Sequence, residues 1–168
     1  MAARTLTPAE WRELSDGLAA ALDRAMVHPR IQARAHPAAH IAALWRGSTP
    51  IMAVRRTLWW PNAAEDFAGS PSMAVLQHEL QHLLDYAEGR LSVGRYLLRP
   101  RNWTYDYDLS EALDWDALGA EQRASLAEVL WRCERRGDAV MVARLRSLIP
   151  WTRLASPESD RGAGGFPG

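Results

Sequence analysis

The sequence predicts a mainly helical α+β domain with a short β-sheet. Its 168 residues are close to the usual size of one domain, and 48% hydrophobic and 24% charged residues are ordinary for a globular protein. Apolar residues recur at helical spacing in several segments, whereas a single segment has the β-branched and aromatic content of a strand. We therefore expect one domain over residues 1–155, followed by a disordered tail over the Gly/Pro/Ser-rich residues 156–168.

The N-terminal part is expected to contain two helices. Thr7-Pro8-Ala9-Glu10 combines an N-cap threonine, a proline at the first helical position and the glutamate of a capping box. Apolar residues then follow at helical spacing to about Met26, and His28-Pro29 ends this helix. A second, short helix is expected over residues 37–46, closed by Gly47.

The expected strand covers Ile51 to Trp60, because its β-branched and aromatic residues suit an extended chain. Pro61-Asn62 ends it. A helix is then expected from Ser70-Pro71 to Gly89, with the glycine just beyond its last turn.

The C-terminal third returns to helices after a segment of mixed signals. Residues 90–117 are expected to be mainly loop, with room for a short strand. A helix is predicted over residues 118–136 and ended by Gly137, and another over residues 139–149.

Charge and cysteine content argue against several functional classes. All twenty basic residues are arginine and are balanced by twenty acidic residues, so we expect no nucleic-acid partner. Cys133 is the single cysteine, which excludes an intramolecular disulfide and a cysteine-based zinc site. No stretch has the roughly 20 apolar residues of a membrane span. Charges throughout residues 1–26 argue against a signal peptide, so we expect a cytoplasmic location, with signal-independent export as the alternative.

The motif with the clearest chemistry is His78-Glu79-Leu80-Gln81-His82. Two histidines four residues apart lie one turn above each other on a helix, so both imidazoles can reach one Zn²⁺. Glu79 would project toward the metal and act as general base on its water. Both histidines fall on a polar face of the expected helix, opposite an apolar face. This separation favours a zinc-dependent peptidase over the other interpretation, two unrelated surface histidines.

A catalytic zinc ion usually takes a third protein ligand and keeps one position open. We favour Glu121, at the start of the next predicted helix, although the helix dipole alone would also favour a glutamate there. Asp85 lies on the histidine face but nearly a turn too far along, where it would more readily orient His82. Glu111 and Glu128 are further alternatives.

Six segments of the chain carry a resemblance to a known group of proteins: Ile51-Met52-Ala53, Trp60, Asp66-Phe67, the helix with His78 and His82, Tyr105-x-Tyr107-x-Leu109, and Glu121-Gln122-Arg123-Ala124. Their order resembles that of small bacterial zincin-like metallopeptidases of the vgr-related or Rhs-associated type. The resemblance covers residues 50–137 and implies a minimal gluzincin-type fold, Zn²⁺ on His78, His82 and Glu121, and an association with contractile secretion machinery. A peptide or protein substrate is expected from the zinc motif and not from the resemblance. The sequence departs from the group at residues 83–85 and in its helical, alanine-rich N-terminal region.

A rival hypothesis keeps the scaffold without the activity. The chain would then be a non-catalytic adaptor or secretion-system component with a structural metal or none. Glu79 is dispensable for holding zinc, so its presence favours the enzyme.

Two features of the expected enzyme stay open. The bond cleaved could be a peptide bond or a related amide, as in peptidoglycan. The metal could be a divalent ion other than zinc, because other divalent ions bind similar donor sets.

Overall fold

The computed structural model describes residues 3–39, 49–98, 102, 104, 106–109 and 113–155, and every structural statement below concerns these residues. They confirm a mainly helical α+β class with a small sheet. The helices and strands, including the 3-10 helices η2 and η3, are β1 (Arg4–Thr5), α1 (Pro8–Glu13), α2 (Asp16–Arg24), β2 (Arg30–Gln32), β3 (Met52–Val54), β4 (Thr57–Trp59), α4 (Ser72–Ala87), α5 (Val93–Leu98), η2 (Trp115–Ala117), α6 (Ala120–Arg136), α7 (Ala139–Leu148) and η3 (Pro150–Ala155).

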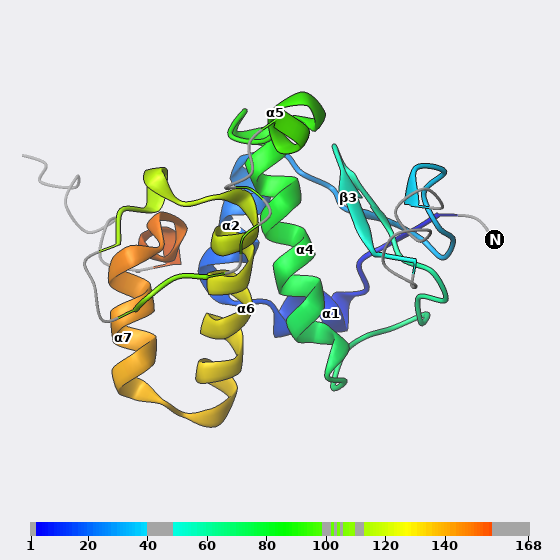
Figure 1. Ribbon diagram of the computed structural model, residues 1–168. Coiled ribbons are helices and arrows are strands. Elements are labelled where there is room, and N and C mark those ends of the chain that lie inside the picture. Colours follow the sequence, from blue (N-terminus) through cyan, green and yellow to red (C-terminus); the bar gives the residue numbers. More distant parts are fainter. Residues whose placement is uncertain are drawn as a thin grey trace, which may run out of the picture.

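The long helix α4 occupies the centre of the arrangement (Figure 1). The sheet lies on one side of α4, and α6 and α7 lie on the other. Contacts of α4 with α6, with β3 and with α2 join the two sides. One cluster of buried apolar side chains runs from Leu6 to Trp151, so all these elements share a core.

The first predicted helix is two helices, α1 and α2. Its start is as predicted, because Thr7 Oγ1 accepts from the Glu10 N–H at 3.0 Å and Glu10 accepts from the Thr7 N–H at 2.7 Å. The prediction that it runs unbroken to about Met26 was wrong. Leu14 is extended, with a ψ of 152°, and α2 begins two residues later. The break lets Gly17 of α2 lie directly against the backbone of η3.

The sheet has the strand order β1-β2-β4-β3, with β2 parallel to β4 and the outer pairs antiparallel. The prediction of one strand over residues 51–60 was wrong in its middle, where β3 and β4 form a hairpin and Val54 pairs with Thr57. Arg55 and Arg56 form the turn, and Arg55 has a φ of 57°. Two-residue hairpin turns usually carry Asn or Gly, so two arginines gave no turn signal.

The predicted helices in the second half of the chain are confirmed as α4, α6 and α7, within two residues at each end. Gly89 and Gly137 follow α4 and α6 with φ values of 72° and 70°, the left-handed conformation expected of a residue that closes a helix. The segment predicted to be mainly loop, residues 90–117, also contains α5 and η2.

Two predictions fall on residues outside the described part of the chain. The helix expected over residues 37–46 lies largely within residues 40–48, and the expected tail is residues 156–168. Within the described part, no helix is long and apolar enough to cross a membrane.

Candidate metal centre

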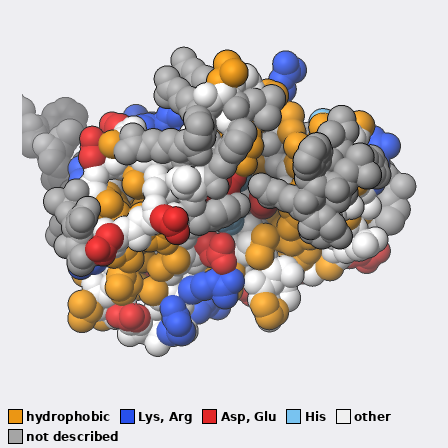
Figure 2. Space-filling model, viewed as in Figure 1, with side chains coloured by type: hydrophobic (Ala, Val, Ile, Leu, Met, Phe, Trp, Pro, Cys, Tyr) orange, Lys and Arg blue, Asp and Glu red, His pale blue; other side chains and the backbone are white. Residues whose placement is uncertain are grey.

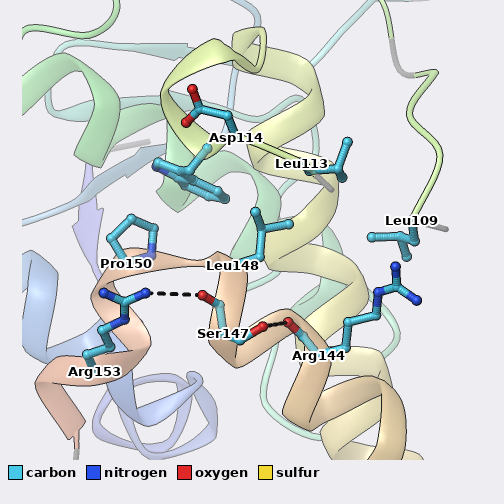
Figure 3. Close-up of a pocket in the computed structure, with 9 residues that line it drawn as sticks. Leu109, Leu113, Asp114, Arg144, Ser147, Leu148, Pro150 and Arg153 are labelled. Carbon is cyan, nitrogen blue, oxygen red and sulfur yellow. Dashed lines mark hydrogen bonds between the residues drawn. The ribbon is translucent and has the colours of Figure 1, made fainter. Parts of the chain in front are cut away.

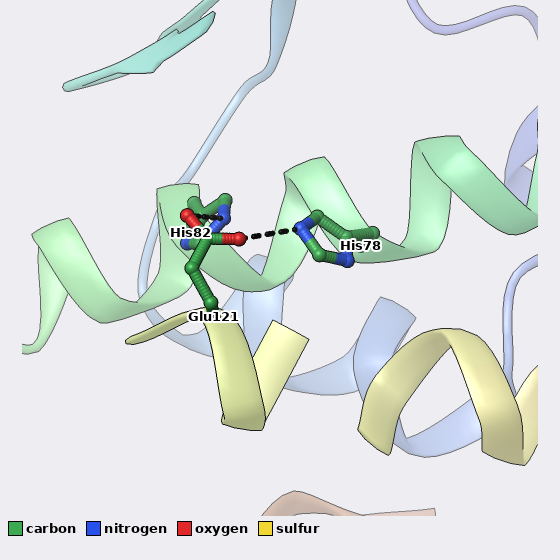
Figure 4. A group of neighbouring side chains, drawn as sticks. All are labelled: His78, His82 and Glu121. Atoms are coloured by element: carbon green, nitrogen blue, oxygen red, sulfur yellow. Dashed lines mark hydrogen bonds and ion pairs between the residues drawn. The ribbon is translucent and has the colours of Figure 1, made fainter. Parts of the chain in front are cut away.

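Three side chains that the sequence singles out meet at the interface of α4 and α6 (Figure 4). His78 and His82 project from consecutive turns of α4, and Glu121 projects from the first turn of α6. Glu121 Oε2 lies 3.2 Å from His78 Nε2, and Oε1 lies 3.5 Å from His82 Nε2. One ligand atom from each side chain lies within 4.8 Å of the others. Two imidazole nitrogens and a carboxylate at this separation fit a divalent cation, and this donor set is typical of catalytic zinc.

The local structure of α6 explains how Glu121 reaches both histidines. Gln122 Oε1 accepts from the Gly119 N–H at 2.8 Å and fixes the start of the helix, which places Glu121 in its first turn. Ala120, Ala124 and Ala127 are fully buried at helical spacing. Because alanine side chains are short, the backbone of α6 can pack closely against its neighbour.

The site is enclosed, because α6 packs against the face of α4 that carries the two histidines. His78, His82 and Glu121 are 9%, 6% and 5% exposed. Figure 2 shows histidine and acidic side chains together near the middle of one face, between the helical part and the sheet. The ligands are therefore largely desolvated, which strengthens every charge interaction among them.

Two further side chains hold the ligands in place. Tyr96, from α5, donates its hydroxyl to Glu121 Oε1 at 2.7 Å. Glu128, two turns along α6 from Glu121, places Oε2 3.5 Å from His78 Nδ1, the nitrogen that does not face Glu121. A carboxylate on the second nitrogen of a metal-binding histidine fixes the ring and raises its basicity. His82 differs, because its buried Nδ1 has no hydrogen-bond partner among the described residues.

The charges of this cluster support one another. Burial opposes protonation of His78, but its contacts with Glu121 and Glu128 outweigh burial and raise its pKa to about 9. Burial likewise opposes ionisation of Glu121, but its contacts with the two histidines and with Tyr96 hold its pKa well below the usual range. The contact with His78 also lowers the pKa of Glu128. The cluster therefore combines two ionised carboxylates with a histidine that readily takes a proton.

Glu79 differs from the other acidic groups of the site. It is 8% exposed, and burial raises the pKa of its carboxyl, which the nearby histidines offset only in part. The charges of His82 and His78 lower this pKa, while those of Glu121 and Glu128 raise it further. Its carboxylate thus stays available for a proton, which a general base requires.

Asp85 does not have the role that the sequence suggested. Its Oδ1 accepts from Gln81 at 2.9 Å and its Oδ2 accepts from Arg123 Nε at 3.0 Å. Gln81 in turn accepts from Trp151 Nε1 at 2.7 Å. The prediction that Asp85 orients His82 was wrong, because Arg123 and Gln81 occupy its carboxylate and make it a structural link between α4 and α6.

The remaining candidates for a third ligand differ in their positions relative to the two histidines. Glu121, which the sequence favours as the third ligand, is the carboxylate that faces both Nε2 atoms. Glu128 contacts the opposite nitrogen of His78, and Glu111 lies outside the described residues. Tyr105 lies outside them too, whereas Tyr107 packs against the core. Sequence reasoning missed Tyr96, because nothing in residues 90–98 signalled that α5 would bring a tyrosine to the site.

A hollow of about 460 Å³ lies elsewhere, beside α7 and η3 (Figure 3). Arg144 and Arg153 border it, and Arg153 donates to the Ser147 carbonyl at 3.2 Å. None of the three candidate metal ligands lines it.

Comparison of the chain with protein-family models, with curated proteins and with solved structures finds no match. The cluster of His78, His82 and Glu121 is therefore the feature of the described residues that points to a function.

Proposed function

We propose that this protein is a zinc-dependent metallopeptidase that hydrolyses a peptide or related amide bond. The observation that carries the proposal is the meeting of His78, His82 and Glu121, with Glu79 beside them as a buried carboxyl group whose pKa is raised. The resemblance to small bacterial zincin-like metallopeptidases supports the same activity and fold. It also supports an association with secretion machinery, whereas the expected peptide or protein substrate follows from the proposed peptidase chemistry.

His78, His82 and Glu121 would hold the ion. A zinc ion bound there would supply Lewis acidity, which activates water and polarises a substrate carbonyl. Tyr96 and Glu128 would keep Glu121 and His78 in position through the contacts already described. The donor atoms of these three residues suit Zn²⁺, because two neutral imidazoles and one carboxylate bind the ion and leave a coordination position for water.

Glu79 would move the proton. As a general base it accepts a proton from the attacking water, and as the conjugate acid it returns that proton to the leaving amine. A raised pKa suits the first step, because a carboxylate whose conjugate acid is weaker takes a proton from water more readily. Low exposure keeps bulk water from competing for that proton.

The test compares Glu79→Gln with the wild type and with His82→Ala. We expect about one zinc per chain in the wild type and in Glu79→Gln, measured by mass spectrometry, and its loss in His82→Ala. Against a peptide library the Glu79→Gln rate should fall by about 10²–10⁴-fold. Glu65→Gln, which changes an exposed carboxylate outside the candidate ligand group, is the matched control. Hydrolysis by Glu79→Gln at the wild-type rate would refute the proposal.

A non-catalytic role with a structural metal is the second candidate, and the low exposure of the three ligands favours it. Under this alternative, zinc would bind and stabilise the fold while no amide substrate is cleaved. Glu79→Gln would then match the wild type in metal content, stability and partner binding.

A further inference from the structure

A second hollow, of about 590 Å³, lies at one end of the sheet, and we call it the sheet-end pocket. It lies beside the start of β2 and the turn between β3 and β4, and none of the three candidate metal ligands lines it. Its basic and aromatic lining comprises Arg30, Arg55, Arg56, His28, His36 and Trp59.

The charge around this pocket is unbalanced. Residues 24–64 contain six arginines and no aspartate or glutamate, while the rest of the chain has fourteen arginines and twenty acidic residues. The ion pairs of the described residues leave out Arg30, Arg55 and Arg56. Three guanidinium groups at one hollow therefore form an uncompensated positive site in a chain of zero net charge.

The backbone at this pocket adopts a conformation that is unfavourable for its sequence. Arg55 has a φ of 57°, in the left-handed region that glycine and asparagine occupy with less strain. The tight turn places the side chains of Arg55 and Arg56 at the pocket. Strain of this kind concentrates at sites that clamp ligands, because a turn chosen only for folding would use a better-suited residue.

The other two kinds of lining group suit a ligand with both an anionic and a flat apolar part. His36 Nδ1 accepts from the Ala38 N–H at 3.1 Å, so the neutral ring carries its proton on Nε2 and can donate. The Trp59 ring lies edge-on to His36 at 5.0 Å, with the Arg34 guanidinium 5.1 Å from its centroid. Trp59 therefore supplies an aromatic wall within a basic environment.

We propose that the sheet-end pocket binds a phosphate-bearing small molecule of nucleotide size. Guanidinium groups match phosphate in charge and in paired hydrogen bonds. The volume lies within the roughly 300–1,000 Å³ range of small-molecule sites, and far exceeds what one phosphate ion would fill. The basic side chains meet at one hollow, which favours a small phosphate ester over an extended nucleic acid.

The experiment measures binding by calorimetry to the full chain, with AMP, adenosine, inorganic phosphate and a ten-nucleotide single strand as probes. AMP should bind, adenosine and phosphate should each bind at least about tenfold more weakly, and the single strand should bind no more tightly than AMP. Arg30→Gln with Arg56→Gln should weaken AMP binding about 100-fold, since two charged contacts to phosphate are lost. His82→Ala should leave AMP binding unchanged, which separates this result from the fate of the metal site.

Two control variants keep the test interpretable. Arg144→Gln with Arg153→Gln removes the same charge beside the other hollow and should not affect AMP binding. Arg55→Asn keeps a residue that tolerates a positive φ, so it should fold and lower AMP affinity. The proposal fails if AMP does not bind or if Arg30→Gln with Arg56→Gln binds as the wild type does. It also fails if phosphate binds as tightly as AMP, or if the single strand binds far more tightly.

Discussion

Glu121 contacts three side chains, two from successive turns of α4 and one from α5. His78 and His82 approach its two oxygens from α4, and Tyr96 donates to it from α5. Glu128 then holds the far side of His78. At the scale of single residues, the site is thus a network of polar contacts in which each side chain helps to hold its neighbour in position. Such coupled contacts strengthen one another where water is largely excluded.

The position of Glu128 leads to a prediction about metal affinity. Glu128→Gln keeps the size of the side chain but removes the charge that faces His78 Nδ1. We expect zinc affinity, measured by competition with a chromophoric chelator, to fall by about 10–100-fold while the far-ultraviolet circular dichroism is unchanged. Glu65→Gln should bind zinc as the wild type does. If Glu128→Gln also keeps wild-type affinity, Glu128 has no part in orienting His78.

A second prediction at this scale concerns Glu10, which is fully buried and distant in sequence from the site. Burial alone would raise the pKa of Glu10, but the hydrogen bonds from Arg4 and from the backbone of Thr7 and Phe67 outweigh burial and lower it below 4.5. The unfolded chain therefore takes up this proton first as the pH falls. The stability that Glu10 contributes is complete above pH 4.5 and is lost as the pH falls through the folded-state pKa.

The measurement is urea unfolding of the wild type and Glu10→Gln between pH 7 and pH 3. The wild type should be more stable at neutral pH, by about 2–3 kcal/mol, because the variant loses charged hydrogen bonds. The difference should shrink as the pH falls below the ordinary carboxyl range. A difference that stays constant down to pH 3 would contradict the assigned role of Glu10.

At the scale of helices and strands, the sequence predicted well wherever a local signal determines the structure. The capping box at Thr7 and the closing glycines Gly89 and Gly137 mark helix ends through their own backbone requirements, and all three are confirmed. The break at Leu14 and the turn at Arg55 were missed. The break is followed by Ser15, the N-cap of α2 and a residue type that favours helix starts, so a local signal was overlooked there. At Arg55 no such signal exists, because arginine is not typical of a hairpin turn.

The break at Leu14 has a consequence that can be tested at Gly17 of α2. A Cβ at this position would lie 2.7 Å from the Thr152 Cα and 2.7 Å from the Trp151 carbonyl oxygen, both backbone atoms of η3. Gly17→Ala should therefore destabilise the fold by about 1–3 kcal/mol, as overpacking does. Gly94→Ala in α5 is the matched control, because a Cβ there meets no atom within 4 Å and should be tolerated. Equal stability of the two variants, measured by urea unfolding, would contradict close packing of α2 on η3.

At the scale of the whole molecule, the part of the candidate site that lies on one helix was predictable from local spacing. His78, Glu79 and His82 follow from helix periodicity. Glu121 lies on another helix, and the sequence favoured it among several carboxylates without deciding between them. The packing of α4, α5 and α6 brings Tyr96 and Glu128 to the ligands and joins Asp85 to Arg123. These contacts could not be predicted, because spacing along the chain does not determine how helices pack. A metal ion at this site would cross-link α4 to α6, which belong to the shared core.

This cross-link predicts that zinc stabilises the entire fold and not only the site. An ion that binds the folded chain alone at about 100 times its Kd adds about 2.7 kcal/mol, which raises the Tm of a domain of this size by roughly 5–10 °C. Thermal unfolding of metal-free protein with and without added zinc measures the shift. Glu79→Gln should keep the whole shift, because Glu79 is not a ligand, whereas His82→Ala should lose it. A wild type that shows no shift, or a His82→Ala variant that shows the full shift, would mean that zinc does not bind between α4 and α6.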